Sequence, residues 1–566
     1  MFDIYYKKNN NTSLFKYLEK HDFSNIQNYN PLYKDFFSLD QHNYNNINLN
    51  HRYSIKNIDK KINANEYNIK VMDDKTKTLQ KFSSFFKFSP LMDPVKYMVG
   101  KYKHLEKDKL CCLPNVSLNN CTKKILDKNN SAYIDSFFSY LSSKLLNNHN
   151  FTHGFNFFGS FLAIQKEFNL NICDDIDYLY DSDFFHKNNS ILFEVDEIDE
   201  DKILYSDTRN YRKKIKFSSN NNLELECETI DNNLFEGLFQ ELTLQNMDIH
   251  NNQLKEEYNA VSSKKTKSAK KTNSTCSSRS SNTSKSCSEN SDLLSDSISN
   301  SQISDYSSMN SDDVINAKIK NFPIQIICLE KLENTLDSLI DDEDNTITIK
   351  QWKSCLFQII MILITYQKVF NFTHNDLHTN NIMYVTTDKK FINYKFNNVY
   401  YRVPTYGKIF KIIDFGRAIY SFNGHVMCSD SYHPKGDAAT QYNFEPYFNE
   451  EKPRLEANKS FDLCRLACSL FDYFIDDIAN QNKVKHPIAQ LIIEWTKDDK
   501  GRNILYKNNG EERYPEFKLY KMIVRTVHNH LPQSQLKNTL FQEYISSKRK
   551  IKKQKIINID NMNSMC

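Results

Sequence analysis

The sequence predicts an α+β protein in which a small, strand-rich part precedes a larger helical part. Aromatic, strand-like segments surround one amphipathic helix in the first third of the chain, and long apolar helical segments occupy the second half. A Ser-rich stretch without hydrophobic periodicity separates the two. At 566 residues the chain exceeds what one hydrophobic core usually supports, so we expect more than one folded unit.

Composition and charge favour a soluble protein. Hydrophobic residues make up 39% and charged residues 25% of the chain. A net charge of only +4 favours neither a membrane nor a nucleic acid as partner. The 13 cysteines are scattered and the first residues do not read as a signal peptide, so we expect a reducing, intracellular location, with the nucleus as an alternative. The longest apolar run, 355–366, is shorter than a membrane span.

The first 170 residues predict a loose start followed by strand, helix and strand. Residues 1–64 are rich in Asn and Lys without periodicity, so we expect a loosely structured extension that contains at most a short helix. Residues 67–72 and 78–88 predict two strands joined by a polar turn. Apolar residues at helical spacing predict a helix at 131–146, and residues 155–164 predict an aromatic strand pair around Gly159.

The middle of the chain loses this pattern. Residues 171–250 contain scattered aromatic segments and predict a partly folded insert. Residues 251–313 are rich in Ser, Lys and Asp with few aromatic residues to bury, which predicts disorder. We interpret this segment as a flexible linker, with phosphate acceptance at its Ser–acid pairs as the alternative. A buried strand is predicted at 322–329.

The second half predicts mainly helices. Residues 351–370 are apolar nearly all round, which is typical of a buried helix. A second apolar helix is predicted at 460–474 and further helices within 485–545. Residues 417–456 lack periodicity and predict a long loop.

A basic run at 548–555 lies near the end of the chain. We interpret it as a solvated helix end, with a nuclear-targeting or nucleic-acid role as the alternative.

Residues 373–381 carry most of the functional signal. They read Thr-His-Asn-Asp-Leu-His-Thr-Asn-Asn, and His374, Asp376 and Asn381 stand at the spacing of the H-R-D-L-x-x-x-N catalytic loop. In phosphoryl transfer a carboxylate accepts the proton of the attacking hydroxyl, and an amide oxygen holds a metal ion on the phosphates. Downstream, an apolar strand ends in Asp414-Phe-Gly, which supplies a second carboxylate.

Two other interpretations of this stretch stay open. Asp and Asn are ordinary turn residues, so the motif can also be a capped turn followed by a strand. The alternate spacing of His374, Asp376 and His378 suits a metal site on one face of a strand, although no second His/Cys cluster lies nearby. We expect His378 to support the loop structurally.

Through these motifs the chain resembles the protein-kinase superfamily over roughly 65–545, and within it the serine/threonine kinases encoded by large DNA viruses. The resemblance implies a two-lobed fold with a long insert in the small lobe, ATP and Mg²⁺ as cofactors, and transfer of the γ-phosphate to serine or threonine hydroxyls of a protein substrate. For a viral protein it also implies the host cytoplasm or the virion as location. The expected organisation is an N-terminal extension (1–64), the first part of the small lobe (65–170), a partly folded insert (171–250), a disordered segment (251–313), the last small-lobe strand with the hinge (314–332), the large lobe (333–545) and a basic tail (546–566).

The resemblance also implies roles for individual residues. Asp376 would be the catalytic base, and Asn381 and Asp414 the magnesium ligands. Lys87, in an apolar strand where an unpaired ammonium is costly, would bind the α- and β-phosphates. Its usual partner is a Glu on the following helix, but Asp135 is the one acid that helix offers.

Four further positions follow from the same resemblance. Glu330 and Leu332 would lie in the hinge that binds adenine through backbone groups. His374 and Asp462 would support the catalytic loop, Asp462 by hydrogen bonds to the loop backbone.

The sequence departs from the family pattern in the phosphate-covering loop. It contains no G-x-G-x-x-G, and no glycine precedes Gly100, so ATP must be covered less tightly or by side chains. This departure favours a pseudokinase scaffold as the alternative function, against which the intact Asp376, Asn381 and Asp414 argue. H-x-D-L-H-x-x-N also suits small-molecule phosphotransferases, but the long segment after Asp-Phe-Gly favours a protein substrate.

Two more departures concern the segment around Asp-Phe-Gly. Asn375 replaces the Arg that usually pairs with a phosphate on the activation segment, which predicts activity independent of phosphorylation there. The interval between Asn381 and Asp414 is long, and we expect 391–401 and 408–413 to extend the usual hairpin. No Ala-Pro-Glu ends the activation segment.

Overall fold

The computed structural model describes residues 2–8, 11–117, 121–196, 315–342, 346–476, 478–551 and 554–566. The predicted disorder at 251–313 and the part of the insert beyond residue 196 lie outside these ranges.

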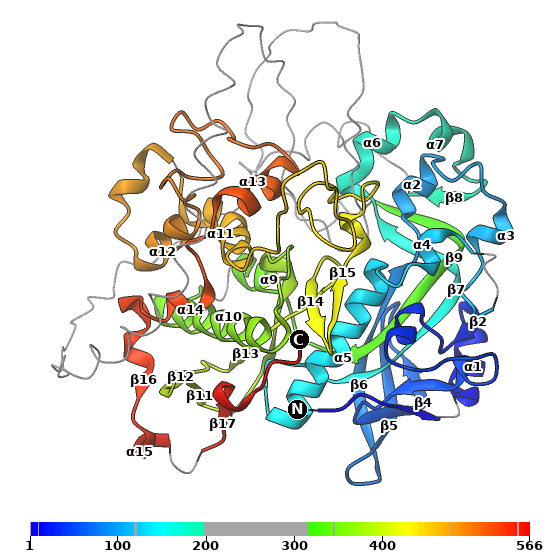
Figure 1. Cartoon of the computed structure of the whole chain (residues 1–566), viewed down its shortest axis with the longest axis horizontal. Coiled ribbons are helices and arrows are strands. Elements are labelled where there is room, and N and C mark those ends of the chain that lie inside the picture. Colours follow the sequence, from blue (N-terminus) through cyan, green and yellow to red (C-terminus); the bar gives the residue numbers. More distant parts are fainter. Residues whose placement is uncertain are drawn as a thin grey trace, which may run out of the picture. The chain divides into compact units, whose positions relative to one another are not determined.

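Seven antiparallel strands form the largest sheet, with the order β2-β7-β9-β6-β5-β4 and β8 paired to β9 (Figure 1). Their bounds are β2 (Phe23–Gln27), β4 (Tyr53–Lys61), β5 (Glu66–Asp73), β6 (Thr78–Pro90), β7 (Phe157–Asn171), β8 (Phe193–Val195) and β9 (Asn316–Glu330). The strands predicted at 67–72, 78–88 and 322–329 are confirmed as β5, β6 and the second half of β9. β9 lies inside the sheet, between β7 and β6, although it is the last of these strands in the sequence.

The expectation of a loose segment at 1–64 is wrong. β1 (Tyr6–Lys8) pairs with β3 (Ile47–Leu49), α1 (Thr12–Glu19) buries Leu14 and Leu18, and β2 and β4 belong to the large sheet. The many asparagines hid this order, because they satisfy one another instead of forming turns. The buried Asn11 amide donates to Asn28 (2.6 Å) and Asn48 (3.0 Å).

The strand pair expected around Gly159 is a single long strand, β7. Gly159 has a φ of +136°, and the pairing with β9 shifts register between Phe157 and Gly159. The glycine therefore makes a β-bulge rather than a turn.

The predicted helix at 131–146 is confirmed as α5 (Ser131–His149). The Asn130 side chain caps its first turn by accepting from Ala132 N. Figure 1 shows α5 between the large sheet and the hairpin of β14 (Ile419–Phe422) and β15 (His425–Cys428). On the side of the hairpin, the ring of Phe138 on α5 packs against the rings of Phe415 (centroids 4.5 Å apart) and Tyr420 (4.8 Å). α5 thus joins the sheet to the segment that follows Asp-Phe-Gly.

The two apolar helices of the second half are confirmed as α10 (Ile349–Phe370) and α11 (Phe461–Phe474). A capping box of Thr348 and Gln351 starts α10. By length and composition alone α10 could cross a membrane, contrary to the estimate from its apolar run, but 83% of its apolar window is buried among the described residues. The other α-helices in the described part of the chain are α2 (Pro94–Met98), α3 (Lys107–Leu110), α4 (Lys123–Leu126), α6 (Ile176–Tyr180), α7 (Asp183–Asn188), α9 (Leu336–Asp341), α12 (Pro487–Trp495), α13 (Lys518–Thr526), α14 (Pro532–Gln535) and α15 (Lys548–Ile551).

The predicted extension of the hairpin before Asp-Phe-Gly is confirmed. β10 (Ile382–Thr386) pairs with β13 (Lys408–Ile412), and between them β11 (Phe391–Phe396) pairs with β12 (Val399–Pro404). The predicted loop at 417–456 is mostly irregular but contains β14 and β15.

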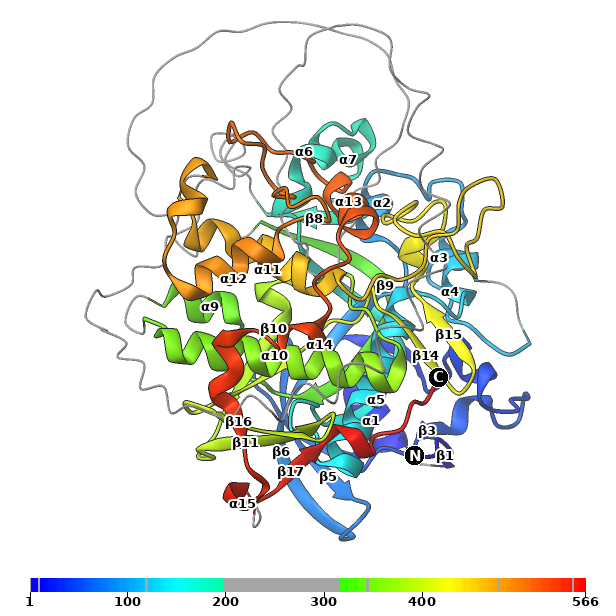
Figure 2. The same cartoon turned by 60° about the vertical axis from the view of Figure 1, so that its left-hand side comes forward.

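The last residues are built into this hairpin sheet rather than forming a basic tail. β16 (Ile545–Ser546) pairs with β12, and β17 (Ile556–Asn558) lies parallel beside β11 (Figure 2). Ile559 and Met562 are buried. The basic residues of α15 are solvated, as expected.

Candidate active site

The loop 373–381 lies between α10 and β10, and Asp462 of α11 fixes its backbone. The carboxylate of Asp462 accepts hydrogen bonds from the backbone N–H of His374 and of Asn375, both at 2.9 Å. This contact was expected, and it explains why a fully buried Asp is tolerated at the start of an apolar helix.

His374 connects the loop to the strand that precedes Asp-Phe-Gly. Its Nε2 lies 2.9 Å from the carbonyl of Ile413, and its Nδ1 accepts from the backbone N–H of Asp376 at 3.3 Å. One nitrogen donates and the other accepts, so the network assigns a neutral ring with the proton on Nε2. His374 thus bonds the loop 373–381 to the strand before Asp-Phe-Gly, in the supporting position expected for it.

Asn381 and Asp414 present the oxygen atoms that a magnesium site needs. The Asn381 amide nitrogen donates to the carbonyl of Asp376 (2.9 Å), and no hydrogen bond within the described residues uses its Oδ1. Asp414 has a φ of +63°, a strained conformation for a non-glycine residue that is common at functional sites. An amide and a carboxylate oxygen are hard donors, and they fit Mg²⁺.

Lys87 lies between two carboxylates. Its Nζ is 2.7 Å from Asp135 of α5 and 3.0 Å from Asp414. Asp135 also accepts from the backbone N–H of Phe415 at 2.9 Å, so the shorter side chain still reaches both neighbours. Burial by itself lowers the pKa of Lys87, but the two carboxylates outweigh it and hold that pKa above its usual value. The ion pair that the sequence left in doubt is present.

Asp376 has one hydrogen-bond partner, Tyr520, that the sequence analysis missed, and Arg465 in turn bonds to Tyr520. The hydroxyl of Tyr520, on α13, donates to Oδ1 of Asp376 at 2.8 Å, and Nε of Arg465, on α11, donates to the same hydroxyl at 2.9 Å. Arg465 is buried, with its guanidinium 5.1 Å from the ring centroid of Tyr520. Nothing local in the sequence marks either residue, since Tyr520 lies 144 positions from Asp376.

His378 was expected to support the loop structurally, but its side chain makes no hydrogen bond among the described residues. Its ring is buried. Burial lowers the pKa of His378 to about 3, so the ring is neutral at physiological pH. The rival metal site is also not supported, because no group of three or more His, Cys, Asp or Glu in the described ranges is placed to hold a metal ion.

The predicted hinge follows directly on β9. The backbone N–H of Glu330 is already engaged, since it donates to the carbonyl of Asn156 at 2.9 Å. The Glu330 carboxylate accepts from the backbone (2.9 Å) and side-chain (3.1 Å) nitrogens of the same Asn156. Leu332 is different, because no hydrogen bond among the described residues uses its backbone N–H or carbonyl. Of the two hinge positions, Leu332 therefore has backbone groups to offer a ligand.

The turn between β4 and β5, at 62–65, lies close to Lys87 in the sheet. Most of it falls in the segment 1–64 that was expected to be a loose extension. Its Asn side chains close it without glycine: Oδ1 of Asn63 accepts from the backbone of Asn65 (3.0 Å) and Glu66 (2.8 Å). Asn65 bonds to Phe86, next to Lys87, through both backbone (2.7 Å) and side chain (2.9 Å).

A cavity of about 780 Å³ is lined by part of the candidate site, namely Asp135, Asp376 and Asp414. Residues of α2, of the start of α5 and of the segment 430–437 also line it, whereas Lys87, Asn381 and Leu332 do not. Its volume lies in the range of small-molecule sites.

Asn375 connects the loop 373–381 to the segment after Asp-Phe-Gly without a charge. Its φ of +64° suits Asn better than most residues. Its amide nitrogen donates to the carbonyl of Arg417 (3.1 Å), and its oxygen accepts from the hydroxyl of Tyr442 (2.5 Å).

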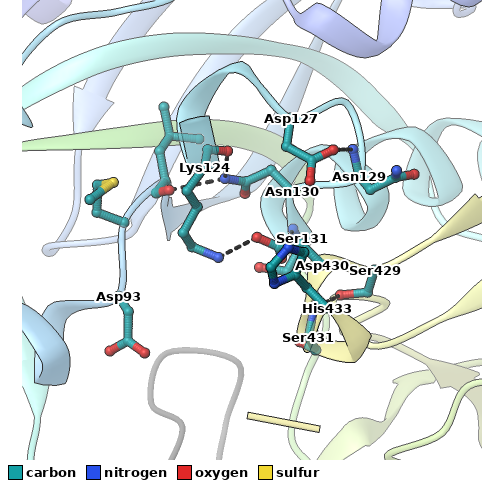
Figure 3. A network of polar contacts seen from close by, with 12 residues as sticks. Asp93, Lys124, Asp127, Asn129, Asn130, Ser131, Ser429, Asp430, Ser431 and His433 are labelled. Atoms are coloured by element: carbon teal, nitrogen blue, oxygen red, sulfur yellow. Dashed lines mark hydrogen bonds and ion pairs between the residues drawn. The ribbon is translucent and has the colours of Figure 1, made fainter. Parts of the chain in front are cut away.

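A second tie runs from the same segment to α5 (Figure 3). The carboxylate of Asp430 forms an ion pair with Lys124 and accepts from the backbone N–H of Ser131, the first residue of α5, at 3.0 Å. The backbone N–H of Asp430 donates to Asn129 at 2.7 Å. A fixed carboxylate at a helix N-terminus is electrostatically favourable, and this helix carries Asp135 one turn later.

Comparison with known proteins gives a partial match. No family model matches the chain. A stretch of 88 residues is 42% identical to a probable serine/threonine-protein kinase of Dictyostelium discoideum. The match covers 14% of this chain and 7% of the length of that protein. The chain is thus similar to a kinase over a short stretch, and the resemblance to viral kinases stays a prediction.

Proposed function

We propose that the protein is an ATP-dependent protein kinase that phosphorylates serine or threonine hydroxyls. The observation that carries this proposal is the arrangement of Lys87 between Asp135 and Asp414 beside Asp376, with all three carboxylates lining one cavity. Phosphoryl transfer needs positioning and charge neutralisation rather than covalent chemistry from the protein, and this set of groups supplies both.

Asp376 orients the acceptor hydroxyl and takes its proton. Tyr520 occupies Oδ1 of this carboxylate, which leaves Oδ2 to face the hydroxyl. Asn381 and Asp414 would hold Mg²⁺, which neutralises charge on the phosphates. Lys87 holds Asp414 in place and binds phosphate oxygens from the sheet side.

ATP is held without a glycine-rich loop. The backbone of Leu332 offers hydrogen bonds to the base. Phe85 lies two residues before Lys87 on the same face of β6, and with 37% of its surface exposed it supplies an apolar ring for stacking. The asparagine-closed turn at 62–65 covers the phosphates with side chains.

The activity is independent of phosphorylation of the segment after Asp-Phe-Gly. Two sets of contacts hold that segment in place. Asn375 accepts a hydrogen bond from Tyr442, and Asp430 bonds to Lys124 and to the backbone of Ser131. These contacts take the place of an Arg–phosphate pair on the segment.

The test is incubation of the full chain with γ-labelled ATP, Mg²⁺ and a mixture of protein substrates. Label on protein that disappears in Asp376→Ala supports the proposal. ATP binding without transfer makes the protein a scaffold, and label confined to small molecules makes it a small-molecule phosphotransferase; either result overturns it.

A further inference from the structure

A second cavity of about 780 Å³ lies away from the candidate active site, and no residue lines both. It is bordered by the start of β4, the end of α5, the β11–β12 hairpin and the start of β17. Asn156 also lines it, and the side chain of Asn156 bonds Glu330 at the end of β9 (3.1 Å). The cavity therefore touches both the large sheet and the hairpin sheet.

The described lining of this second cavity is basic and contains no Asp or Glu. Its cations are Arg52, Lys75, Lys389, Lys390, Arg402 and Lys555. Asp73, outside the lining, neutralises Arg52 through a bidentate contact at 2.7 and 3.0 Å. Lys75 donates to the carbonyl of Asn147 (2.9 Å), and the ion pairs of the described residues include none of the remaining lysines. Several positive charges thus face one concave space without counter-charges.

Polar atoms in the wall also lack partners. Nε of Arg402, Oγ1 of Thr152 and Oδ1 of Asn393 are buried and make no hydrogen bond within the described residues. The guanidinium carbon of Arg402 lies 3.5 Å from the ring centroid of Phe391, and this cation–π contact restrains the side chain before any ligand arrives. These three atoms are shielded from solvent, so the exposed Lys389, Lys390 and Lys555 of the lining are the groups that can reach a ligand.

We propose that this second cavity binds a compact polyphosphate, either inorganic or attached to a small organic group. Guanidinium and ammonium groups that converge on a concave site suit several phosphate oxygens at short spacing. The enclosed volume matches a small molecule. A nucleic acid would need an extended basic stripe, and the net charge of +4 over 566 residues does not favour one.

The proposal does not rest on the kinase assignment, and its test is separate. Calorimetric titration of the full chain with inorganic tripolyphosphate, in EDTA so that no metal ion recruits the probe to Asp414, measures affinity. Lys389→Ser/Lys390→Ser should weaken binding at least about tenfold, because two charge-assisted contacts are lost. Both lysines are exposed, so the fold should tolerate the change. Lys452→Ser/Lys459→Ser removes the same charge from exposed positions elsewhere and should leave the affinity unchanged.

Two further arms decide between ligands and sites. Lys87→Met should retain tripolyphosphate binding, since Lys87 does not line the second cavity. Loss of binding in Lys87→Met, equal loss in the two lysine pairs, or no binding at all would overturn the proposal. Tighter binding of a 12-nucleotide single strand than of tripolyphosphate, lost in Lys389→Ser/Lys390→Ser, would assign the cavity to nucleic acid and overturn it as well.

Discussion

The hydroxyl of Tyr520 is the contact that most directly positions the proposed base. It donates to Oδ1 of Asp376 at 2.8 Å and receives a hydrogen bond from the buried Arg465. A carboxylate held on one oxygen keeps the other directed at the substrate, and this orientation matters only in the reacting complex.

Tyr520→Phe should therefore lower kcat about tenfold with little change in KM for ATP, since one hydrogen bond to a charged group is lost. Steady-state kinetics with ATP varied measures both constants. Tyr506→Phe is the matched control, because its hydroxyl also donates to a carboxylate, Asp472 (2.7 Å), outside the site. Unchanged kcat in Tyr520→Phe, together with a lowered unfolding temperature, would reduce Tyr520 to a packing role.

Among the buried histidines, His51 and His153 lie outside the candidate active site, and they predict how stability depends on pH. Burial lowers the pKa of His51 to about 3 and that of His153 to about 4, and nearby lysines add to the effect. Below the unfolded value near 6.5 the unfolded chain binds protons that the folded chain does not, so stability falls as pH drops from about 6.5 toward 4.

Each of these histidines should cost about 2 kcal/mol of unfolding free energy between pH 6.5 and pH 5. Urea unfolding at both pH values measures the difference. His153→Gln should reduce the loss by about that amount, whereas His21→Gln, at an exposed position, should not. An equal pH dependence in His153→Gln and the unchanged protein would contradict the buried neutral state.

The residue scale also shows what the sequence could and could not predict. Asp376, Asn381 and Asp414 stand in recognisable motifs, whereas the resemblance to kinases was needed to propose Lys87, Asp135 and Asp462. The structure places these side chains in one hydrogen-bonded and ion-paired region. Tyr520, Arg465 and Asp430 carry no local signal, because their roles come from contacts with distant parts of the chain.

At the scale of elements, α5 is held at two points, its first residue Ser131 and Asp135 one turn later. Asp430 and Lys124 fix its first turn, and Asp135 holds Lys87 and the backbone of Phe415 one turn later. A shift of the first turn would therefore move the ion pair that the proposed ATP site needs.

Asp430→Asn should lower kcat/KM by at least about tenfold, because Lys124 would be left without its charged partner. Lys128→Met is the control for this variant, since it breaks the neighbouring but exposed pair with Asp35 (2.7 Å) and should lower kcat/KM little.

Phosphatase treatment, checked by mass spectrometry, should leave the unchanged protein fully active. Loss of activity on dephosphorylation would contradict the proposal that the contacts of Asp430 and Asn375 hold the segment without a phosphate.

Regular elements were predictable where their periodicity is strong, and not elsewhere. β5, β6, α5, α10 and α11 follow from alternating or helical spacing of apolar residues. The order within 1–64 was missed because asparagines, which usually signal turns, bond to one another in its interior. β17 was missed because a three-residue strand has no pattern of its own and depends on β11 for pairing.

At the scale of the whole molecule, the end of the chain stabilises the helical part. Lys368 of α10 donates to the carbonyl of Ile559 at 2.6 Å, and Met565 N donates to Val369 at 2.8 Å. The last residues thus pack on the helix that leads into the loop 373–381.

Ile559→Ala should destabilise the protein by about 2–5 kcal/mol, since the side chain is fully buried. Chemical denaturation of the full chain measures the change. Lys548→Ser/Lys550→Ser, in the exposed basic run, should change stability by less than about 0.5 kcal/mol. Similar effects of the two variants would mean that the tail contributes charge rather than packing.

The most direct test of the proposed function is a single-turnover measurement of phosphoryl transfer from γ-labelled ATP to a protein acceptor. Asp376→Asn keeps the shape of the side chain and should still bind ATP, but it removes the group that takes the proton. We expect its transfer rate to fall about 10²- to 10⁴-fold with ATP affinity nearly unchanged. Equal rates in Asp376→Asn and the unchanged protein, or ATP binding without any transfer by the unchanged protein, would contradict the proposal.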